Sequence, residues 1–400
     1  MDVVGWRLDE VVELIRGKAN SWVRLQVKRG EDSIKAVAIR REKVKLEDQA
    51  ASKKMIKLPG NAIGPEMNIA VITVPNFYLD FEAMRRGDAD AKSTTRDVAR
   101  ILNELSNMQV DGIIIDLRDN GGGSLMEATQ LTDLFIDQGP VVQIMNSENQ
   151  VDRRSRAVGT VNYNGPLLVL VNHLSASASE IFAGAIQDYQ RGLIVGDQTF
   201  GKGTVQTLIP LNQGKLKITE AKFYRVSGES TQHRGVIPDI NFPALLPYDE
   251  IGESALQHAL PWDKIQPAPH YRFADLDSYT PLLKDNHEKR MKNNVEYDFL
   301  LKRTQWMDKQ RKRKTIPLNL SKRDELKKEE NFNIIQMTNA VRVAKGLPEF
   351  KSISEIEEDA QKKRDAKNPQ DDFLLMESAR ILGDFIEKQP ENIRKVAATR

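Results

Sequence analysis

Near the N-terminus, the spacing of apolar residues has first the period of a helix and then that of strands. In residues 7–16 apolar side chains recur at i, i+3, i+4 and i+7, which predicts a short amphipathic helix that ends at Gly17. Alternating apolar and polar residues predict strands at 23–27 and 34–39, joined by a turn at Gly30-Glu31-Asp32. One helix and two strands in ~45 residues form only part of a domain.

From Asn68 onward, apolar runs alternate with helical patterns. In chain order they predict a strand at 69–74, a helix at 98–108, a strand at 110–117, a helix at 125–136, strands at 141–145 and 167–171, a helix at 177–189, and a strand at 193–195. This rhythm predicts an α/β core whose strands are buried on both faces. Active sites of such sheets lie beyond the carboxyl ends of strands, where the turns 119–123 and 173–177 fall.

After Pro261 the composition changes to long, charged helices. The basic run 311–314 could bind phosphate, but interleaved acidic residues and few aromatic side chains favour a solvated helix face. A later helix has an apolar stripe, which indicates that the last third of the chain is folded. The stripe consists of Leu374, Ile381, Leu382 and Phe385.

Composition narrows the function classes. The 400 residues suggest two or three domains, and the net charge of +2 gives no electrostatic case for nucleic acid or an anionic membrane. The absence of cysteine excludes disulfides, thiol catalysis and cysteine-based zinc sites. Apolar runs are far shorter than the ~20 residues of a membrane-spanning helix, and the first residues lack the features of a signal peptide. We therefore expect a soluble chain without an export signal.

Ser177 and Lys202, which lie 25 positions apart, suggest a serine hydrolase with a lysine base. A serine hydroxyl is a poor nucleophile until a neighbouring group takes its proton, and lysine does this only if burial lowers its pKa from about 10.4. A buried strand at 192–196 would supply an apolar pocket. In a strand, Lys202, Thr204 and Gln206 share one face, so Gln206 could hold the amine toward Ser177. The commoner alternative is an exposed glutamine.

The same residues also fit other motifs. Ser177-x-x-Glu180 has the pattern of a capping box, which favours a serine that only begins a helix. Three features favour a catalytic serine instead: its place at a helix N-terminus, the small residues around it, and the free backbone N–H groups that Gly121–Gly123 could offer. Residues 196–202 match seven positions of a phosphate-binding loop, but Gly203 stands where a hydroxyl is needed, and a strand with a proline follows.

A Ser-His-Asp triad is not favoured. His173 lies on the same short loop as Ser177, without a separate supporting element. Asp188 is 11 residues further along the same predicted helix, which places it roughly 16 Å away. We interpret it as a hydrogen-bonded carboxylate near the helix end.

Several segments resemble the carboxyl-terminal processing proteases, most closely their bacterial periplasmic tail-specific subgroup. The catalytic segments are 116–123, 175–185, 187–189 and 195–206. Residues 2–9 resemble the latter part of the PDZ domain of these proteases, 222–226 and 235–240 resemble the end of their protease core, and the helical last third resembles their C-terminal domain.

The resemblance implies a role for each residue of the site. Ser177 would be the nucleophile, Lys202 the general base and Gln206 the residue that orients the lysine, while the backbone N–H groups of Gly123 and Ala178 would bind the oxyanion. It also implies a crotonase-like core that needs no cofactor, and protein substrates that have apolar C-terminal tails. The resemblance further implies a periplasmic setting with a lipoprotein adaptor, and any peripheral association with a membrane would be through that adaptor.

We therefore expect the C-terminal part of a PDZ domain at 1–45, a protease core at 46–245 and a helical domain at 246–400. Relative to the family, the chain lacks the helical region before the PDZ domain and the carboxylate-binding loop, so we expect an N-terminally truncated form. The leading hypothesis is a serine endopeptidase. The alternatives are a catalytically impaired fragment that acts as a peptide-binding or adaptor protein, and a nucleotide-dependent enzyme.

Overall fold

The computed structural model describes residues 1–400 except 1, 4, 7, 29–33, 43–49, 61–65, 89–90, 157–160, 367 and 390–400. The chain divides into two compact units, Met1–Gln49 and Ala50–Arg400. The predicted turn at Gly30-Glu31-Asp32 and the expected boundary at 45/46 lie outside the described residues. The boundary at 245/246 stays a prediction.

The smaller unit contains the predicted helix and strands. Helix α1 spans Leu8–Ile15, and strands β1 (Trp22–Val27) and β2 (Lys35–Arg40) pair antiparallel. The Arg41 guanidinium donates to the carbonyl oxygens of Leu14 and Ile15, at 3.2 and 2.6 Å, which ties the end of the helix to the strand that precedes Arg41. The three predicted elements of this region are thereby confirmed.

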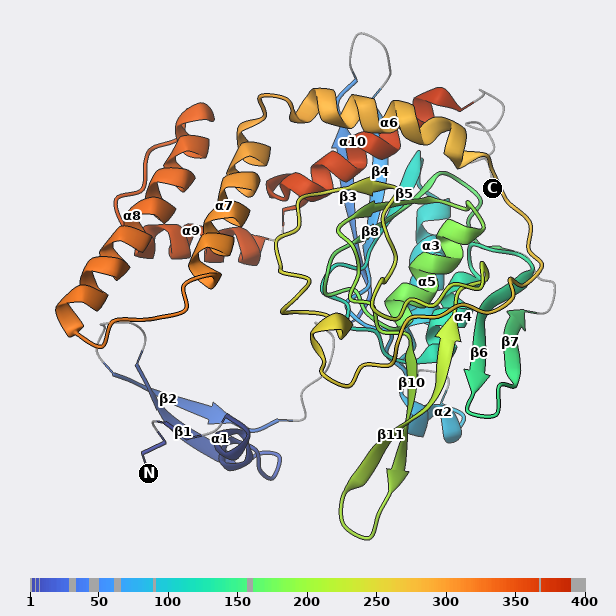
Figure 1. The fold of residues 1–400 in the computed structure, drawn as a ribbon, viewed down its shortest axis with the longest axis horizontal. Coiled ribbons are helices and arrows are strands. Elements are labelled where there is room, and N and C mark those ends of the chain that lie inside the picture. Colours follow the sequence, from blue (N-terminus) through green and yellow to red (C-terminus); the bar gives the residue numbers. More distant parts are fainter. Residues whose placement is uncertain are drawn as a thin grey trace. The chain divides into compact units, whose positions relative to one another are not determined.

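The larger unit is built on a central sheet that, in its described residues, has six strands (Figure 1). Their order is β12 (Ile240–Asn241), β9 (Leu193–Gly196), β8 (Leu167–Val171), β5 (Gly112–Asp116), β4 (Met67–Thr73) and β3 (Ser52–Leu58). Neighbours from β12 to β4 are parallel, and β3 is antiparallel to β4. Because β5, β8 and β9 are buried along their whole length, the predicted α/β core with doubly covered strands is confirmed.

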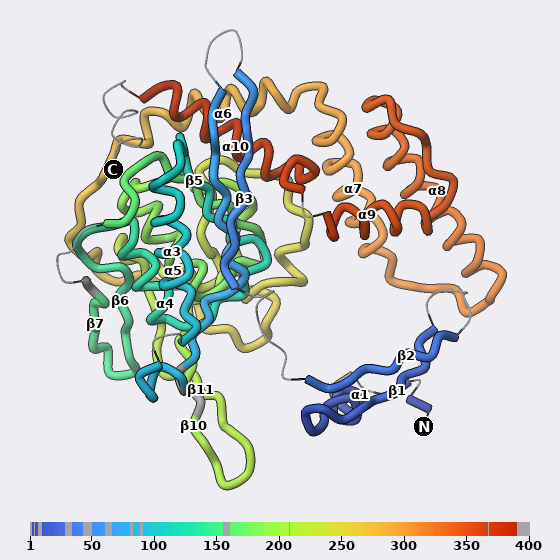
Figure 2. Tube along the Cα trace, turned by 180° about the vertical axis from the view of Figure 1, so that it is seen from behind, coloured from blue at the N-terminus to red at the C-terminus, as the bar shows by residue number. Residues whose placement is uncertain are grey.

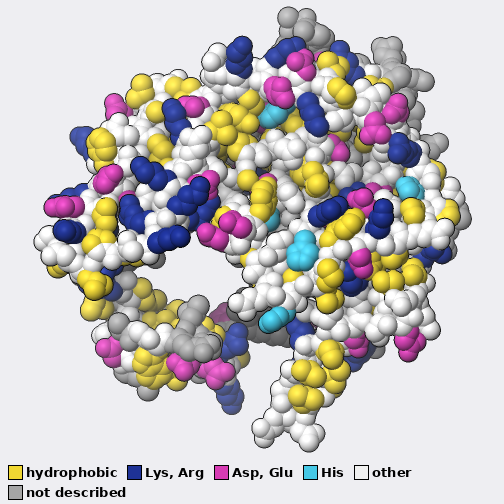
Figure 3. All heavy atoms as spheres, viewed as in Figure 1, with side chains coloured by type: hydrophobic (Ala, Val, Ile, Leu, Met, Phe, Trp, Pro, Cys, Tyr) yellow, Lys and Arg dark blue, Asp and Glu magenta, His cyan; other side chains and the backbone are white. Residues whose placement is uncertain are grey.

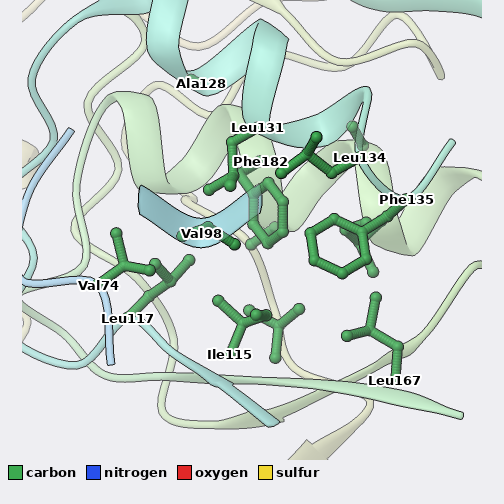
Figure 4. Packing of buried hydrophobic residues seen from close by; sticks show 14 of the residues in the cluster. Val74, Val98, Ile115, Leu117, Ala128, Leu131, Leu134, Phe135, Leu167 and Phe182 are labelled. Carbon is green, nitrogen blue, oxygen red and sulfur yellow. The ribbon is translucent and has the colours of Figure 1, made fainter. Parts of the chain in front are cut away.

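One face of the sheet is covered by α3 (Thr94–Ser106), α4 (Leu125–Thr132) and α5 (Ala178–Asp188). Figure 4 shows side chains of these helices packed over Ile115 and Leu167 of the sheet. Phe135, which follows α4, meets Phe182 of α5 edge to face with ring centroids 5.8 Å apart. A short helix, α2, spans Phe81–Arg85. This cluster fixes the start of α5, where the candidate serine lies.

The opposite face is covered by α6 (Leu276–Met291) and α10 (Phe373–Lys388), which lie side by side in Figures 1 and 2. Their apolar side chains form a second buried cluster with those of the sheet. The helices contribute Leu276, Leu283, Leu375, Ala379, Ile381, Leu382, Phe385 and Ile386. Part of the predicted helical region thus completes the core of the α/β unit.

The remaining C-terminal helices pack against one another (Figure 1). They are α7 (Val295–Arg311), α8 (Leu320–Ala344) and α9 (Ile353–Ala366). The basic run 311–314 begins at the last residue of α7 and continues past it. Arg311 pairs with Asp308 and Arg313 pairs with Glu330 at 3.0 Å, so acidic residues neutralise part of this run.

A second, antiparallel sheet has four strands within the described ranges, in the order β10-β11-β6-β7. These strands are β6 (Gly139–Asn146), β7 (Val151–Arg156), β10 (Thr204–Pro210) and β11 (Lys215–Tyr224). The β10–β11 hairpin projects from the unit (Figure 1), and Figure 3 shows hydrophobic side chains on it. The predicted strand after Lys202 is confirmed, so no helix is present there to bind phosphates.

Among the described residues, no helix is long and apolar enough to cross a membrane. The same residues contain no cluster of three or more side chains that could hold a metal ion.

Candidate active site

Ser177 lies in the turn between β8 and α5, with a backbone conformation that is uncommon for a residue with a side chain. Its φ and ψ are 57° and −110°, whereas an N-cap residue ordinarily adopts extended backbone angles. Such strained positions are concentrated at functional sites, because the surrounding structure must hold them in place. The turn presents Ser177 at the N-terminal end of α5, where partial positive charge favours an anion.

Glu180 holds Ser177 in this conformation through the carboxylate half of the predicted capping box. The Ser177 N–H donates to Glu180 Oε2 at 2.7 Å. The same oxygen accepts a hydrogen bond from the Lys202 N–H at 3.0 Å, and Oε1 accepts from the Gly201 N–H and the Thr199 hydroxyl, both at 2.7 Å. One buried carboxylate therefore joins the serine turn to the lysine loop.

Burial strongly affects this carboxylate. It raises the pKa of Glu180 to about 7, against the opposing effect of the hydrogen bonds from Thr199, Gly201, Ser177 and Lys202. The sequence identified Glu180 only as a capping residue. Its contact with residues 199–202 depends on the return of the chain after β9, which no local pattern encodes.

All five residues of the predicted site line a cavity of about 360 Å³. They are Gly123, Ser177, Ala178, Lys202 and Gln206. Apolar side chains of Leu125, Ile181 and Phe223 also line it. The strand at 192–196 is buried as expected, but it is not among the lining residues. The prediction that this strand supplies the apolar pocket around Lys202 was therefore wrong. The apolar side chains named above come from α4, α5 and β11.

Burial lowers the pKa of Lys202, and the positive charge of Lys217 lowers it further. Lys217, on β11, also lines the cavity that contains Ser177 and Lys202. No carboxylate is present among the described residues that line this cavity. The Lys202 ammonium donates to Gln206 Oε1 at 3.4 Å. Gln206 is exposed and also contacts the lysine. It is therefore both the exposed glutamine and the partner of the lysine amine that the sequence offered as alternatives.

The loop that contains Gly123 is fixed against the serine turn. The Asn120 carbonyl oxygen accepts from the Ala176 N–H at 2.9 Å and from the Ser179 hydroxyl at 2.8 Å. Gly123 has a φ of 143°, and a Cβ added there would lie 2.3 Å from the Phe77 carbonyl oxygen. Only glycine fits such a position.

The backbone N–H groups of Gly123 and Ala178 are available to a ligand. In the described part of the chain neither has a hydrogen-bond acceptor, and both residues line the cavity beside Ser177. Two N–H donors next to a serine at a helix N-terminus can stabilise negative charge on a substrate oxygen.

The other candidate groups near Ser177 are engaged elsewhere. The two ring nitrogens of His173 lie 2.9 Å from the Gln198 carbonyl oxygen and 2.6 Å from that of Ile251. Asp188 forms a partly buried ion pair with Arg225 and accepts the Ser227 N–H at 3.1 Å. Asp188 is therefore the structural carboxylate near the end of α5 that the sequence predicted.

Comparison with known proteins identifies the family. A model described as peptidase family S41 matches residues 68–242, and a model of the C-terminal domain of tail specific protease matches residues 246–387. The tail-specific protease of Haemophilus influenzae is 37% identical over 400 residues, which cover 96% of this chain and 53% of that protein. The chain belongs to peptidase family S41. The resemblance predicted from the sequence is confirmed.

Other similar proteins match a shorter part of the chain. A carboxy-terminal-processing protease of Bartonella bacilliformis is 34% identical over 264 residues, or 64% of this chain and 56% of that protein. The solved structure of a photosystem II D1 C-terminal processing protease has 29% identity and a TM-score of 0.43, and the match covers 61% of this chain and 62% of that one. The chain spans about half the length of these curated relatives.

Proposed function

We propose that this S41 chain is a serine endopeptidase with a Ser177–Lys202 dyad. The observation that carries the proposal is the shared cavity: a strained serine, a lysine with a lowered pKa and two unpaired N–H groups from the described residues all line it. These are the parts that acyl transfer needs, namely a nucleophile, a base and oxyanion donors.

In the proposed reaction, neutral Lys202 accepts the Ser177 hydroxyl proton while the serine oxygen attacks the scissile carbonyl carbon. The carbonyl oxygen becomes an oxyanion that accepts hydrogen bonds from the Gly123 and Ala178 N–H groups. Lys202 then returns the proton to the leaving amine, which frees the first product. Water hydrolyses the acyl-enzyme with the same base. In this proposal Gln206 orients the amine of Lys202, with which it forms a 3.4 Å contact.

The proposal extends to the substrate and the cellular setting. The names of the tail-specific and carboxy-terminal-processing relatives support a protein substrate recognised by its C-terminal tail. We further propose that the tail is apolar, that the α/β unit has a crotonase-like core, and that residues 1–45 belong to a PDZ domain. A periplasmic location and a lipoprotein adaptor belong to the same proposal, which rests on the resemblance to the tail-specific subgroup.

The test is cleavage of an unstructured protein that ends in apolar residues, and of short peptides cut from it, by the chain and its variants. Ser177→Ala and Lys202→Ala should each abolish cleavage, while Lys215→Ala, a matched exposed lysine on the β10–β11 hairpin, should leave it unchanged. Cleavage that survives either site substitution would contradict the dyad. Binding of the tail without cleavage of any peptide would instead support the non-catalytic, peptide-binding alternative.

A further inference from the structure

Arg118 lies between β5 and the Gly121–Gly123 loop and binds two carboxylates. Its Nε and Nη2 donate to Asp116 Oδ1 and Oδ2 at 2.9 and 2.7 Å. Its Nη1 and Nη2 donate to Asp372 Oδ1 and Oδ2 at 3.1 and 2.7 Å. Paired bonds of this kind fix the plane of a guanidinium group, so they set its direction as well as its position.

The two carboxylates differ in what they attach Arg118 to. Asp116 is two residues before Arg118 in the same strand end, so its bonds are local. Asp372 is 254 positions away and is the N-cap of α10, where its Oδ1 accepts the Leu375 N–H at 3.0 Å. Asp116 ties Arg118 to the end of the buried strand β5, and Asp372 ties it to α10, which is embedded in the second buried cluster.

The turn after Arg118 leads directly to the proposed oxyanion donor. The Asp119 N–H donates to Asn172 Oδ1 at 2.9 Å, and the Asn120 side chain accepts the Gly122 N–H at 2.9 Å. Asp119 has a φ of 62°, a left-handed conformation that aspartate adopts more readily than most residues. Gly123 follows Arg118 closely in the chain, and this short, hydrogen-bonded segment is the route by which Arg118 would act on Gly123.

Arg118 also has space into which it could move. Asp116, Arg118, Asp119 and Asp372 line a cavity of about 580 Å³ at the carboxyl ends of the parallel strands, and neither Ser177 nor Lys202 is among its lining residues. Without Asp372, Arg118 would keep its bonds to Asp116 but lose both bonds that tie it to α10.

We propose that Asp372 is a positioning residue for catalysis: through Arg118 it fixes the turn that presents the Gly123 N–H to the oxyanion. The inference rests on the proposed function. It assigns the start of α10, in the segment that matches the C-terminal domain of tail specific protease, a part in the geometry of the active site.

The test compares Asp372→Ser with Asp384→Ser. Serine keeps the N-cap hydrogen bond of α10 but cannot reach Arg118 with two oxygens. Asp384 is a matched control on the same helix, because it pairs with Arg290 at 2.6 Å and lies twelve residues, roughly 18 Å, further along the axis. Asp372→Asn is the second variant, should the serine variant fail to fold.

The readouts are kcat, KM and inhibition by a peptide aldehyde, whose adduct with Ser177 carries an oxyanion. For Asp372→Ser we expect kcat to fall about tenfold or more, KM to stay within about twofold, and aldehyde affinity to fall in parallel with kcat. Binding of a substrate peptide is measured in proteins that carry Ser177→Ala and therefore cannot cleave it. Adding Asp372→Ser to Ser177→Ala should not change the affinity for this peptide. The Asp384→Ser enzyme should match the wild type in all of these.

Unchanged kcat in Asp372→Ser and Asp372→Asn would overturn the inference, as would equal losses in the Asp372 and Asp384 variants. A loss of ground-state peptide binding without a change in kcat would also overturn it. Failure of the proposed function has a different signature, since either the wild type would cleave no peptide or Ser177→Ala would retain full cleavage.

Discussion

The backbone N–H of Lys202 donates at 3.0 Å to the side-chain carboxylate of Glu180. The carboxylate oxygen that accepts it also accepts the Ser177 N–H. The proposed nucleophile and the proposed base are therefore held by the same atom. Their separation depends on a side chain that takes no part in the chemistry. This relationship explains how two loops that follow different strands can keep a fixed geometry.

Glu180→Gln should reduce kcat by about a hundredfold. The carboxylate accepts four hydrogen bonds, and an amide group would turn its NH2 toward at least one of these donors. Glu127→Gln is the matched control, since Glu127 is also buried and accepts bonds from Ser93 and Thr95 outside the site. Steady-state kinetics would contradict the assignment if both variants lost activity equally.

Glu180 should also make stability depend on pH. Its pKa is raised to about 7 in the folded chain from 4.5, so the folded state holds the proton more tightly than the unfolded state. The free energy of unfolding should therefore fall as pH rises from 4.5 to about 7 and become level above that. Urea unfolding from pH 5 to 8 measures this slope, and the slope should be smaller in Glu180→Gln. An equal slope in both proteins would show that other groups cause it.

Activity should rise with pH as Lys202 loses its proton, and Lys217→Gln should move this rise to higher pH. Lys217 is the second cause of the lowered pKa of Lys202, after burial, so its removal raises that pKa. The measurement is the pH profile of kcat/KM. Lys215→Gln, on the same hairpin, is the control. A flat profile from pH 6 to 9 in the wild type would rule out lysine as the base.

Gly122→Ala should remove most activity and lower the melting temperature, whereas Gly121→Ala should leave the melting temperature close to that of the wild type. Gly122 has a φ of 100°, and a Cβ there would lie 2.7 Å from the Ala176 carbonyl oxygen and 2.9 Å from Ser177 Cβ. A Cβ added at Gly121 would meet only open space, and the φ of Gly121 is not positive. The two variants should therefore differ in melting temperature, and kcat should fall in Gly122→Ala. Similar melting temperatures in both would mean that the loop tolerates displacement.

Asp188→Asn should destabilise the chain by about 3 kcal/mol without changing the pH profile of cleavage. The substitution leaves the partly buried Arg225 without its charged partner, and Asp188 does not line the catalytic cavity. Asp285→Asn breaks an exposed pair with Lys289 and should cost less than about 1 kcal/mol. Denaturant unfolding compares the two. A shifted pH profile in Asp188→Asn would give that carboxylate a role in catalysis.

The sequence predicted the elements whose side chains alternate between a core and solvent or lie wholly in a core. It missed four strands, β3, β7, β11 and β12. β7 is rich in arginine and β11 is exposed along most of its length, so neither has an apolar period, while β3 contains three lysines and β12 has only two residues. Ser177 and Lys202 were identifiable from their motifs. The links made by Glu180 and Asp372 were not, because each joins segments that only the folded chain brings together.

The packing of α10 has a consequence for the order in which the chain is made. Residues 373–386 supply much of the apolar cover for one face of the central sheet, and all of the described strands of that sheet are synthesised earlier. Until this helix leaves the ribosome, that face presents Val71, Ile114 and Leu168 to water or to other chains. Folding of the nascent chain is therefore completed late, and the preceding strands need protection from aggregation during translation.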